Sequence, residues 1–149
     1  MCAFAASRVL VVEDDGTVRG FLSRALESGG YVPVPVRTGE EALAVVHAQR
    51  GIAVTLIDGL LPDMHGVRLA DAILDSPKGA SIAICFVSGA VHDPKSGGAG
   101  VAALGKPVRV AELLAAVDAL VRWRRQGGSR PEQRRAALRR LEQEFLVGP

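Results

Sequence analysis

The polar residues that could do chemistry follow short apolar runs. They are Glu13, Asp14 and Asp15 after the run 8–12, Asp58 at the end of 53–58, Ser88 at the end of 81–88, and Lys106 after 101–104. Clustered carboxylates repel one another, and their pKa values rise unless a cation neutralises them. Mg²⁺ suits this role because it binds oxygen ligands, commonly one or two carboxylates together with water or phosphate. With a lysine and a hydroxyl nearby, the set suits phosphoryl transfer onto a carboxylate.

Lys106 also belongs to a second pattern. The stretch GVAALGKP, residues 100–107, has the spacing of a nucleotide phosphate-binding loop: glycine, four residues, glycine, lysine. Such a loop needs Ser or Thr directly after the lysine to place a hydroxyl on Mg²⁺, and this chain has Pro107 there. Lys106 could therefore meet a nucleotide phosphate, another phosphoryl group, or neither. The groups that the rest of the chain brings to it decide between these alternatives.

Five β-like runs alternate with helical patterns along the chain. The runs are 8–12, 31–36, 53–58, 81–88 and 101–104, and the first four helical patterns are 17–28, 38–49, 67–74 and 108–122. This alternation predicts a doubly wound α/β fold with a parallel sheet and helices on both faces. Ligands of such sheets bind beyond the carboxyl ends of the strands, where the polar residues above must gather. Taken singly, each of those residues also fits an ordinary surface role, and only their joint occurrence at four strand ends favours a site.

The segment between the fourth and fifth runs contains few residues that favour a helix. Residues 89–100 read GAVHDPKSGGAG, with four glycines and a proline. Interior glycine costs a helix about 1 kcal/mol and proline about 3 kcal/mol. We expect a short or mobile helix here, or a loop.

Four motifs together resemble one family. VVEDD, LIDGLLPDMHG, FVSGA and GKP, in this order and spacing, look like the receiver domain of two-component response regulators, over roughly residues 7–122. The resemblance implies a flavodoxin-like fold whose five-stranded parallel sheet has the order 2-1-3-4-5. It also implies that the chain accepts a phosphoryl group from a sensor histidine kinase or a histidine phosphotransfer protein. The product is a signal and not a metabolite, so we do not expect an ordinary enzyme. The domain would catalyse only its own phosphorylation and dephosphorylation.

The resemblance assigns a role to each polar residue. It makes Asp58 the phosphoacceptor, places Mg²⁺ on Glu13, Asp14, Asp58 and the backbone carbonyl of Leu60, and gives the phosphoryl contacts to Ser88 and Lys106. Pro62 and Gly66 would shape the turn after the acceptor. Lys106 then meets an aspartyl phosphate, and its nucleotide-loop pattern is coincidental.

Three departures from the family pattern affect switching. Ala103 stands where the family has an aromatic side chain, and the segment between Ser88 and Lys106 is several residues shorter than usual. Both changes fall on the face that receivers commonly use for output. Leu60 and Ala90 occupy positions that influence water access to the phosphoryl group, and both are apolar. We expect slow self-dephosphorylation from this third departure.

The last residues form a basic tail. Residues 122–149 hold eight arginines against three glutamates, a net charge of +5, and residues 1–121 carry −3. We divide the chain into a receiver domain, 1–124, and a basic linker with an amphipathic helix, 125–149. The helix, 131–146, places Leu138, Leu141 and Phe145 on one stripe. It could dock on the body, pair two copies as a homodimer, or link to a downstream domain; binding of nucleic acid is disfavoured because the tail lacks a recognition-helix pattern.

Two alternatives to a phosphorylation switch stay open. One is a receiver fold that binds a protein partner constitutively through its altered output face or its tail, and the other is a nucleic-acid binder acting through the arginines. The start, MCAFAASR, lacks signal-peptide features, and no apolar run approaches the roughly 18 residues of a membrane span. Cys2 and Cys85 show no disulfide or zinc spacing. We therefore expect a cytoplasmic protein with reduced thiols and no membrane partner.

Overall fold

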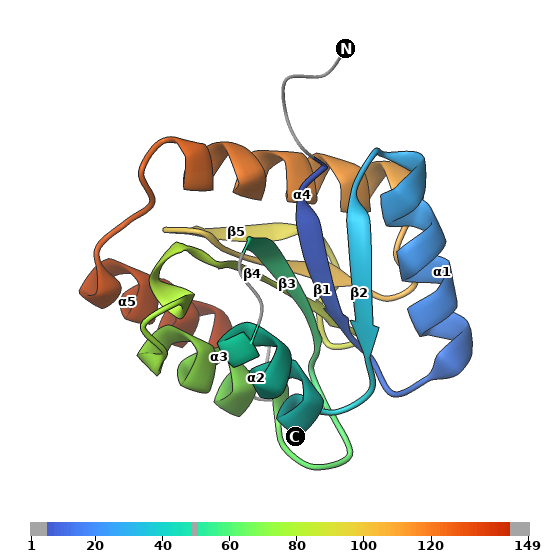
Figure 1. The fold of residues 1–149 in the computed structure, drawn as a ribbon, viewed down its shortest axis with the longest axis horizontal. Helices are drawn as coiled ribbons and strands as arrows, with labels where there is room; N and C mark the ends of the chain where they lie inside the picture. Colours follow the sequence, from blue (N-terminus) through green and yellow to red (C-terminus); the bar gives the residue numbers. More distant parts are fainter. Residues whose placement is uncertain (1–5, 49–50, 144–149) are drawn as a thin grey trace.

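The protein folds as a six-stranded sheet covered by helices on both faces (Figure 1). The computed structural model describes residues 6–48 and 51–143. The strands are β1 (Arg8–Val12), β2 (Val32–Val36), β3 (Ile52–Asp58), β4 (Ala83–Ser88), β5 (Lys95–Gly98) and β6 (Val101–Gly105). The helices are α1 (Gly16–Ser28), α2 (Gly39–Ala48), α3 (Gly66–Asp75), α4 (Val110–Arg125) and α5 (Pro131–Leu141), with a short 3₁₀ helix at Gly79–Ser81.

The order of the strands is β2-β1-β3-β4-β6-β5. The five predicted strands lie parallel in the expected order 2-1-3-4-5, with β6 in the fifth place, so the flavodoxin-like prediction is confirmed. β2 lies at one edge and pairs only with β1, which explains how it tolerates Pro33 and Pro35. β3 and β4 are covered on both faces, and almost every residue in them is buried.

The segment between β4 and β6 differs from the prediction. The structure places the antiparallel strand β5 where we expected a short helix or a loop, so the sheet has six strands and not five. Lys95 pairs with Ala103, and the chain reverses through Gly98, Ala99 and Gly100, all with positive φ. Glycine adopts this backbone at little cost. The same glycines that disfavour a helix therefore favour a hairpin.

Two buried clusters lie on opposite faces of the sheet. On one face, α1 and α4 cover residues such as Val9, Val11 and Leu104. On the other face, α2, α3 and α5 cover residues such as Leu10 and Phe86. Side chains alternate between the two faces along a strand, so neighbours such as Val9 and Leu10 belong to different clusters.

The predicted C-terminal helix is present and docks on the body. α5 follows a linker in which Gly127 and Gly128 have positive φ, and it lies beside α3 in Figure 1. Its own residues Ala137, Leu138 and Leu141 are buried against the body. Cys2, Gln49 and Phe145, which the sequence predictions include, lie outside the described residues. No helix among residues 6–48 and 51–143 has the length and apolar character needed to cross a membrane.

Candidate phosphoacceptor site

The polar residues predicted from sequence meet at the carboxyl end of the sheet. Asp58 and Ser88 end β3 and β4, Glu13 and Asp14 follow β1, and Lys106 follows β6. One carboxylate oxygen from each of the three acidic residues lies within 4.8 Å of the others. Sequence spacing thus located the cluster correctly, because parallel strands bring their carboxyl ends to one edge.

Lys106 joins the acidic residues into one network. Its Nζ donates to Oε1 of Glu13 at 2.9 Å and to Oδ1 of Asp58 at 3.3 Å. Partial burial would lower the pKa of Lys106, but the hydrogen bond to Glu13 and the charges of Asp58 and Glu13 outweigh it, so the pKa is raised. The ammonium group therefore stays charged and serves as the counter-charge of the cluster.

Glu13 is the buried member of the cluster, with only 2% of its surface exposed. Burial raises the pKa of Glu13, and the charge of Asp58 raises it further. Hydrogen bonds from Lys106 and from the backbone N–H of Asp15 act in the opposite direction but do not cancel the shift. Asp14 is exposed and Asp58 is half-buried. A cluster of one buried carboxyl group with a raised pKa and two less buried carboxylates suits a divalent cation that binds oxygen ligands.

Ser88 lies beside the turn that follows Asp58. A Cβ atom added to Gly59 would come 3.0 Å from the Ser88 hydroxyl oxygen, so the two segments are in close contact. That oxygen accepts a hydrogen bond from the backbone N–H of Ala90 at 3.1 Å. Lys106 donates its backbone N–H to the Ser88 carbonyl at 3.1 Å, which fixes the ends of β4 and β6 relative to each other.

The turn after Asp58 is held tightly at Gly66. A Cβ atom there would lie 2.4 Å from the Asp58 carbonyl oxygen, so the close approach requires glycine, as predicted. The Leu60 side chain is 72% exposed, and its backbone bridges to His65 across the turn. Leu60 thus belongs to the same turn as Asp58, and its backbone N–H lies 3.5 Å from Oδ1 of Asp58.

Two residues at the site were not predicted from sequence. Asp63 accepts hydrogen bonds of 2.9 Å from the backbone N–H groups of both Gly39 and Glu40, and so caps α2 from the turn after Asp58. Arg19 donates to the backbone carbonyls of Glu13 at 2.9 Å and Asp14 at 3.2 Å. The Asp63 contact spans more than twenty residues, so no local pattern could reveal it.

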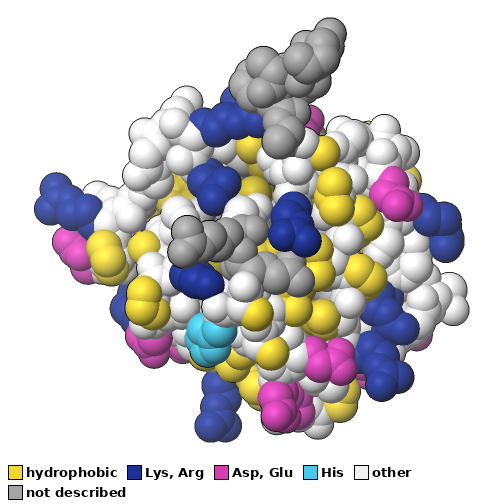
Figure 2. Space-filling view, in the orientation of Figure 1, with side chains coloured by type: hydrophobic (Ala, Val, Ile, Leu, Met, Phe, Trp, Pro, Cys, Tyr) yellow, Lys and Arg dark blue, Asp and Glu magenta, His cyan; other side chains and the backbone are white. Residues whose placement is uncertain are grey.

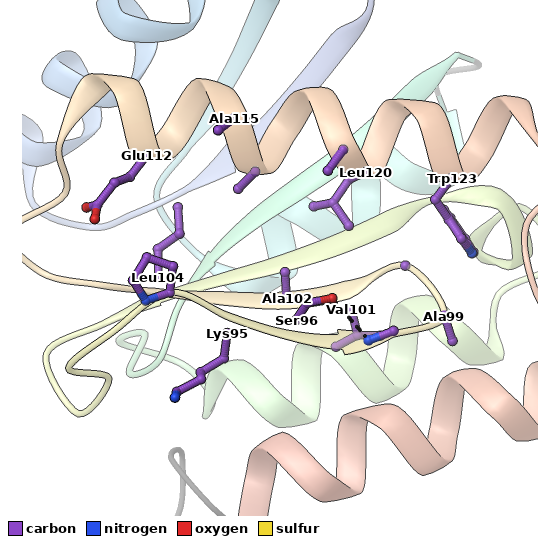
Figure 3. Close-up of a pocket in the computed structure, with 15 residues that line it drawn as sticks. Lys95, Ser96, Ala99, Val101, Ala102, Leu104, Glu112, Ala115, Leu120 and Trp123 are labelled. Carbon is purple, nitrogen blue, oxygen red and sulfur yellow. Dashed lines mark hydrogen bonds between the residues drawn. The ribbon is translucent and has the colours of Figure 1, made fainter.

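Two apolar hollows lie on the surface, one beside α1 and one beside α4. One, of about 600 Å³, lies next to Lys106 and is lined by α1 side chains such as Val18 and Phe21 and by Pro107. The other, of about 450 Å³, lies between α4 and the β5–β6 hairpin. Figure 3 shows Leu120 of α4 facing Ala102 of β6 across this second hollow. Farther along α4, the Trp123 ring packs on Gly100 in the turn before β6.

The comparisons with known proteins decide the family. The family model of the response regulator receiver domain matches residues 9–118, a span that contains every residue of the cluster. This chain is a receiver domain. Response regulator MprA of Mycolicibacterium vanbaalenii is 33% identical over 117 residues, which are 77% of this chain and 50% of that protein. The chain therefore spans about half the length of the curated relatives that it matches.

Solved receiver structures share the fold. The receiver domain protein of Methanospirillum hungatei JF-1 matches with a TM-score of 0.69 and 26% identity, over 83% of this chain and 99% of that one. The receiver domain of sensor histidine kinase PA1611 from Pseudomonas aeruginosa matches with a TM-score of 0.66 and 22% identity, over 78% and 98%. That structure is described with a magnesium ion coordinated in its active-site cleft. The family match and the curated relatives thus make this chain a homologue of the receiver domains of response regulators.

Proposed function

We propose that Asp58 accepts a phosphoryl group in a Mg²⁺-dependent reaction. The observation that carries the proposal is the position of Lys106 Nζ, within hydrogen-bonding distance of both Glu13 and Asp58 beside three clustered carboxylates. An Asp58 oxygen attacks phosphorus, the new O–P bond forms, and the P–N bond of a donor phosphohistidine breaks. The imidazole nitrogen leaves with the electron pair. Positioning and charge neutralisation supply most of the catalysis of such transfers.

The remaining residues hold or neutralise the transferred group. Glu13, Asp14, Asp58 and the Leu60 carbonyl would hold Mg²⁺, which neutralises charge on the phosphoryl oxygens when it is bound. Lys106 then exchanges its contact with Asp58 for a phosphoryl oxygen. The Ser88 hydroxyl donates a hydrogen bond to a second phosphoryl oxygen. These roles make the chain a catalyst of only its own phosphorylation and dephosphorylation.

The phosphodonor in this proposal is a sensor histidine kinase or a histidine phosphotransfer protein in the cytoplasm. The apolar hollow lined by Val18, Phe21 and Pro107 borders Lys106, so a helix seated there would carry its phosphohistidine to Asp58. The family match supports this donor class. Residues 1–124 then form the receiver domain, and residues 125–149 form the appended linker and amphipathic helix.

A constitutive interaction module is the second candidate. Two observations favour it: Ala103 is fully buried where the family has an aromatic residue, and a hairpin lies before β6 where we expected a short helix or a loop. The hollow of Figure 3 lies on this remodelled surface. Phosphorylation without any change in shape or association would support this alternative.

The arginine tail gives less support to nucleic-acid binding or to pairing of two copies through α5. Arg134 and Arg140 donate to backbone carbonyls of the body, and Arg135 and Arg139 pair with Asp71 and Asp75 of α3. The basic side chains visible in Figure 2 are interspersed with acidic ones on the face that carries α2 and α3. These contacts favour intramolecular docking of the tail.

Dependence on Mg²⁺ tests the proposed reaction. The folded chain, incubated with acetyl phosphate, should gain one phosphoryl group when Mg²⁺ is present and none when EDTA removes it. Uptake that is unchanged by EDTA would contradict the assigned role of the acidic cluster.

A further inference from the structure

The helix α5 lies outside the family match, yet it forms part of the receiver core. The match ends at residue 118, and α5 begins at Pro131. Ala137, Leu138 and Leu141 belong to the same buried cluster as Val101 and Ala103 of β6. Burial of apolar side chains stabilises a docked helix, so hydrophobic packing holds α5 on the sheet in addition to its surface ion pairs.

Arg134 anchors α5 to the sheet. Its side chain is only 1% exposed and donates to the carbonyls of Gly79 at 2.7 Å and Ala99 at 3.1 Å, and also to that of Ile82. The guanidinium lies 4.7 Å from the ring centre of Trp123. Burial lowers the pKa of Arg134 to about 10, so the group remains charged at neutral pH. These bonds join α5 to the segment that precedes β4 and to the turn that precedes β6.

The position of α5 explains two departures from the family pattern together. Along β6, Val101 and Ala103 face the cluster that includes α5, and Ala102 and Leu104 face α4. An aromatic side chain at position 103 would project toward the space that α5 fills. The shortened segment before this strand forms β5 at the edge of the sheet. Thus α5 covers the face that both departures would otherwise leave open.

The segment after Ser88 contributes to the same buried cluster as α5. The Ser88 hydroxyl accepts from Ala90, and the Ser88 carbonyl accepts from the N–H of Val91 at 3.3 Å. Val91 is 2% exposed and belongs to the cluster of α5. A Cβ atom on Gly105 would lie 2.1 Å from the Val91 carbonyl oxygen, so the backbone at Val91 is in close contact with β6. Farther along, Arg140 of α5 donates to the Gly97 carbonyl of β5 at 2.6 Å.

We infer that α5 is the element that responds to phosphorylation of Asp58, and that phosphorylation loosens its docking. The inference rests on the proposed function. When the Ser88 hydroxyl turns to bond the phosphoryl group, it gives up its bond with Ala90, and the segment 89–91 shifts. The shift moves Val91 within the buried cluster that it shares with α5, and a close-packed interior transmits such a displacement to the neighbouring side chains. By linkage, weaker α5 docking must in turn favour the phosphorylated state.

Hydrogen exchange on the full chain tests this inference. The chain is measured with Mg²⁺ alone and with Mg²⁺ plus acetyl phosphate, and intact mass reports phosphoryl uptake in the same samples. Peptides from α5 should exchange at least about tenfold faster after phosphorylation, as expected when a docked element opens locally. Peptides from α2, which covers the same face but lies outside the Ser88 contacts, should not change. The Ser88→Ala variant should show no α5 response at equal uptake, and Ser88→Thr should retain it.

The outcomes separate the inference from the proposed function. Phosphoryl uptake at Asp58 with unchanged α5 exchange overturns the inference and leaves the function intact. A Ser88→Ala protein that still loosens α5 overturns the route through Ser88. Absence of uptake in the folded chain overturns the proposed function and the inference with it.

Discussion

Lys106 Nζ lies 2.9 Å from Oε1 of Glu13, a carboxylate that is almost completely buried. The pair connects the loop after β1 to the loop after β6, which are far apart in sequence. Glu13 has no other charged hydrogen-bond partner among the contacts in the described residues, since its second oxygen accepts only from the Asp15 backbone. The stability of the acidic cluster therefore depends on this lysine.

Replacement of Lys106 should destabilise the fold. Lys106→Met leaves Glu13 buried without its cationic partner, so the free energy of unfolding at neutral pH should fall by about 1–3 kcal/mol. Mg²⁺ should restore part of the loss, because it supplies the missing positive charge. Urea denaturation with and without Mg²⁺ measures both effects. Lys78→Met is the matched control, since Lys78 is exposed and its Nζ donates to the backbone carbonyl of His47 within the described part of the chain. An equal loss in the control would refute the assignment.

Asp63 should give the protein an acid-sensitive contribution to stability. Hydrogen bonds from Gly39 and Glu40 lower the pKa of Asp63 below its ordinary value of 3.8. A carboxyl whose folded-state pKa is depressed stabilises the fold above its unfolded pKa, and this stabilisation is lost as pH falls through the folded pKa. The advantage of the wild type over Asp63→Asn should thus be full above about pH 5 and shrink at lower pH. Denaturation midpoints across this range measure it, and a difference independent of pH would contradict the ionic cap.

Leu138 should contribute as much to the stability of the fold as a buried leucine of the central sheet. Leu138 lies on the buried face of α5 and is 0% exposed, so Leu138→Ala should lower the free energy of unfolding by about 2–5 kcal/mol. Leu60→Ala removes the same atoms from a side chain that is 72% exposed and should change stability little. Thermal and urea unfolding of both variants give the comparison. Similar small losses would mean that α5 is only loosely attached.

The aspartyl phosphate should be long-lived. Leu60 and Ala90 are both exposed beside the site and carry no polar side-chain atom that could orient a water molecule for attack. Loss of the phosphoryl group, followed by mass after removal of the donor, should be slow, and Leu60→Gln should accelerate it. A wild-type half-life of only seconds would contradict this expectation.

The residues of the candidate site could be predicted because they depend on one regular feature. Asp58, Ser88 and Lys106 each end or follow a buried parallel strand, and the sheet itself brings such positions together. The contacts of Asp63 and Arg134 could not be predicted, because each reaches backbone groups far away in sequence. Their partners are set by how the helices pack, which a local pattern does not encode.

The hairpin before β6 was missed for a related reason. The glycines and the proline of residues 89–100 correctly indicated that a stable helix is disfavoured. However, Lys95–Gly98 does not alternate apolar and polar residues as a strand usually does. The strand forms because β6 offers an edge with unpaired backbone groups, and the glycines permit the reversal. Tertiary context thus decided between helix, loop and strand.

The most direct test of the central proposal is the site and stoichiometry of phosphoryl uptake. Intact mass would be measured after incubation with acetyl phosphate and Mg²⁺ for the wild type, for Asp58→Asn and for Asp93→Asn, a control carboxylate in the loop before β5. We expect one added phosphoryl group in the wild type and in Asp93→Asn, and none in folded Asp58→Asn. Uptake that persists in Asp58→Asn, or a folded wild type that takes up none, would contradict it.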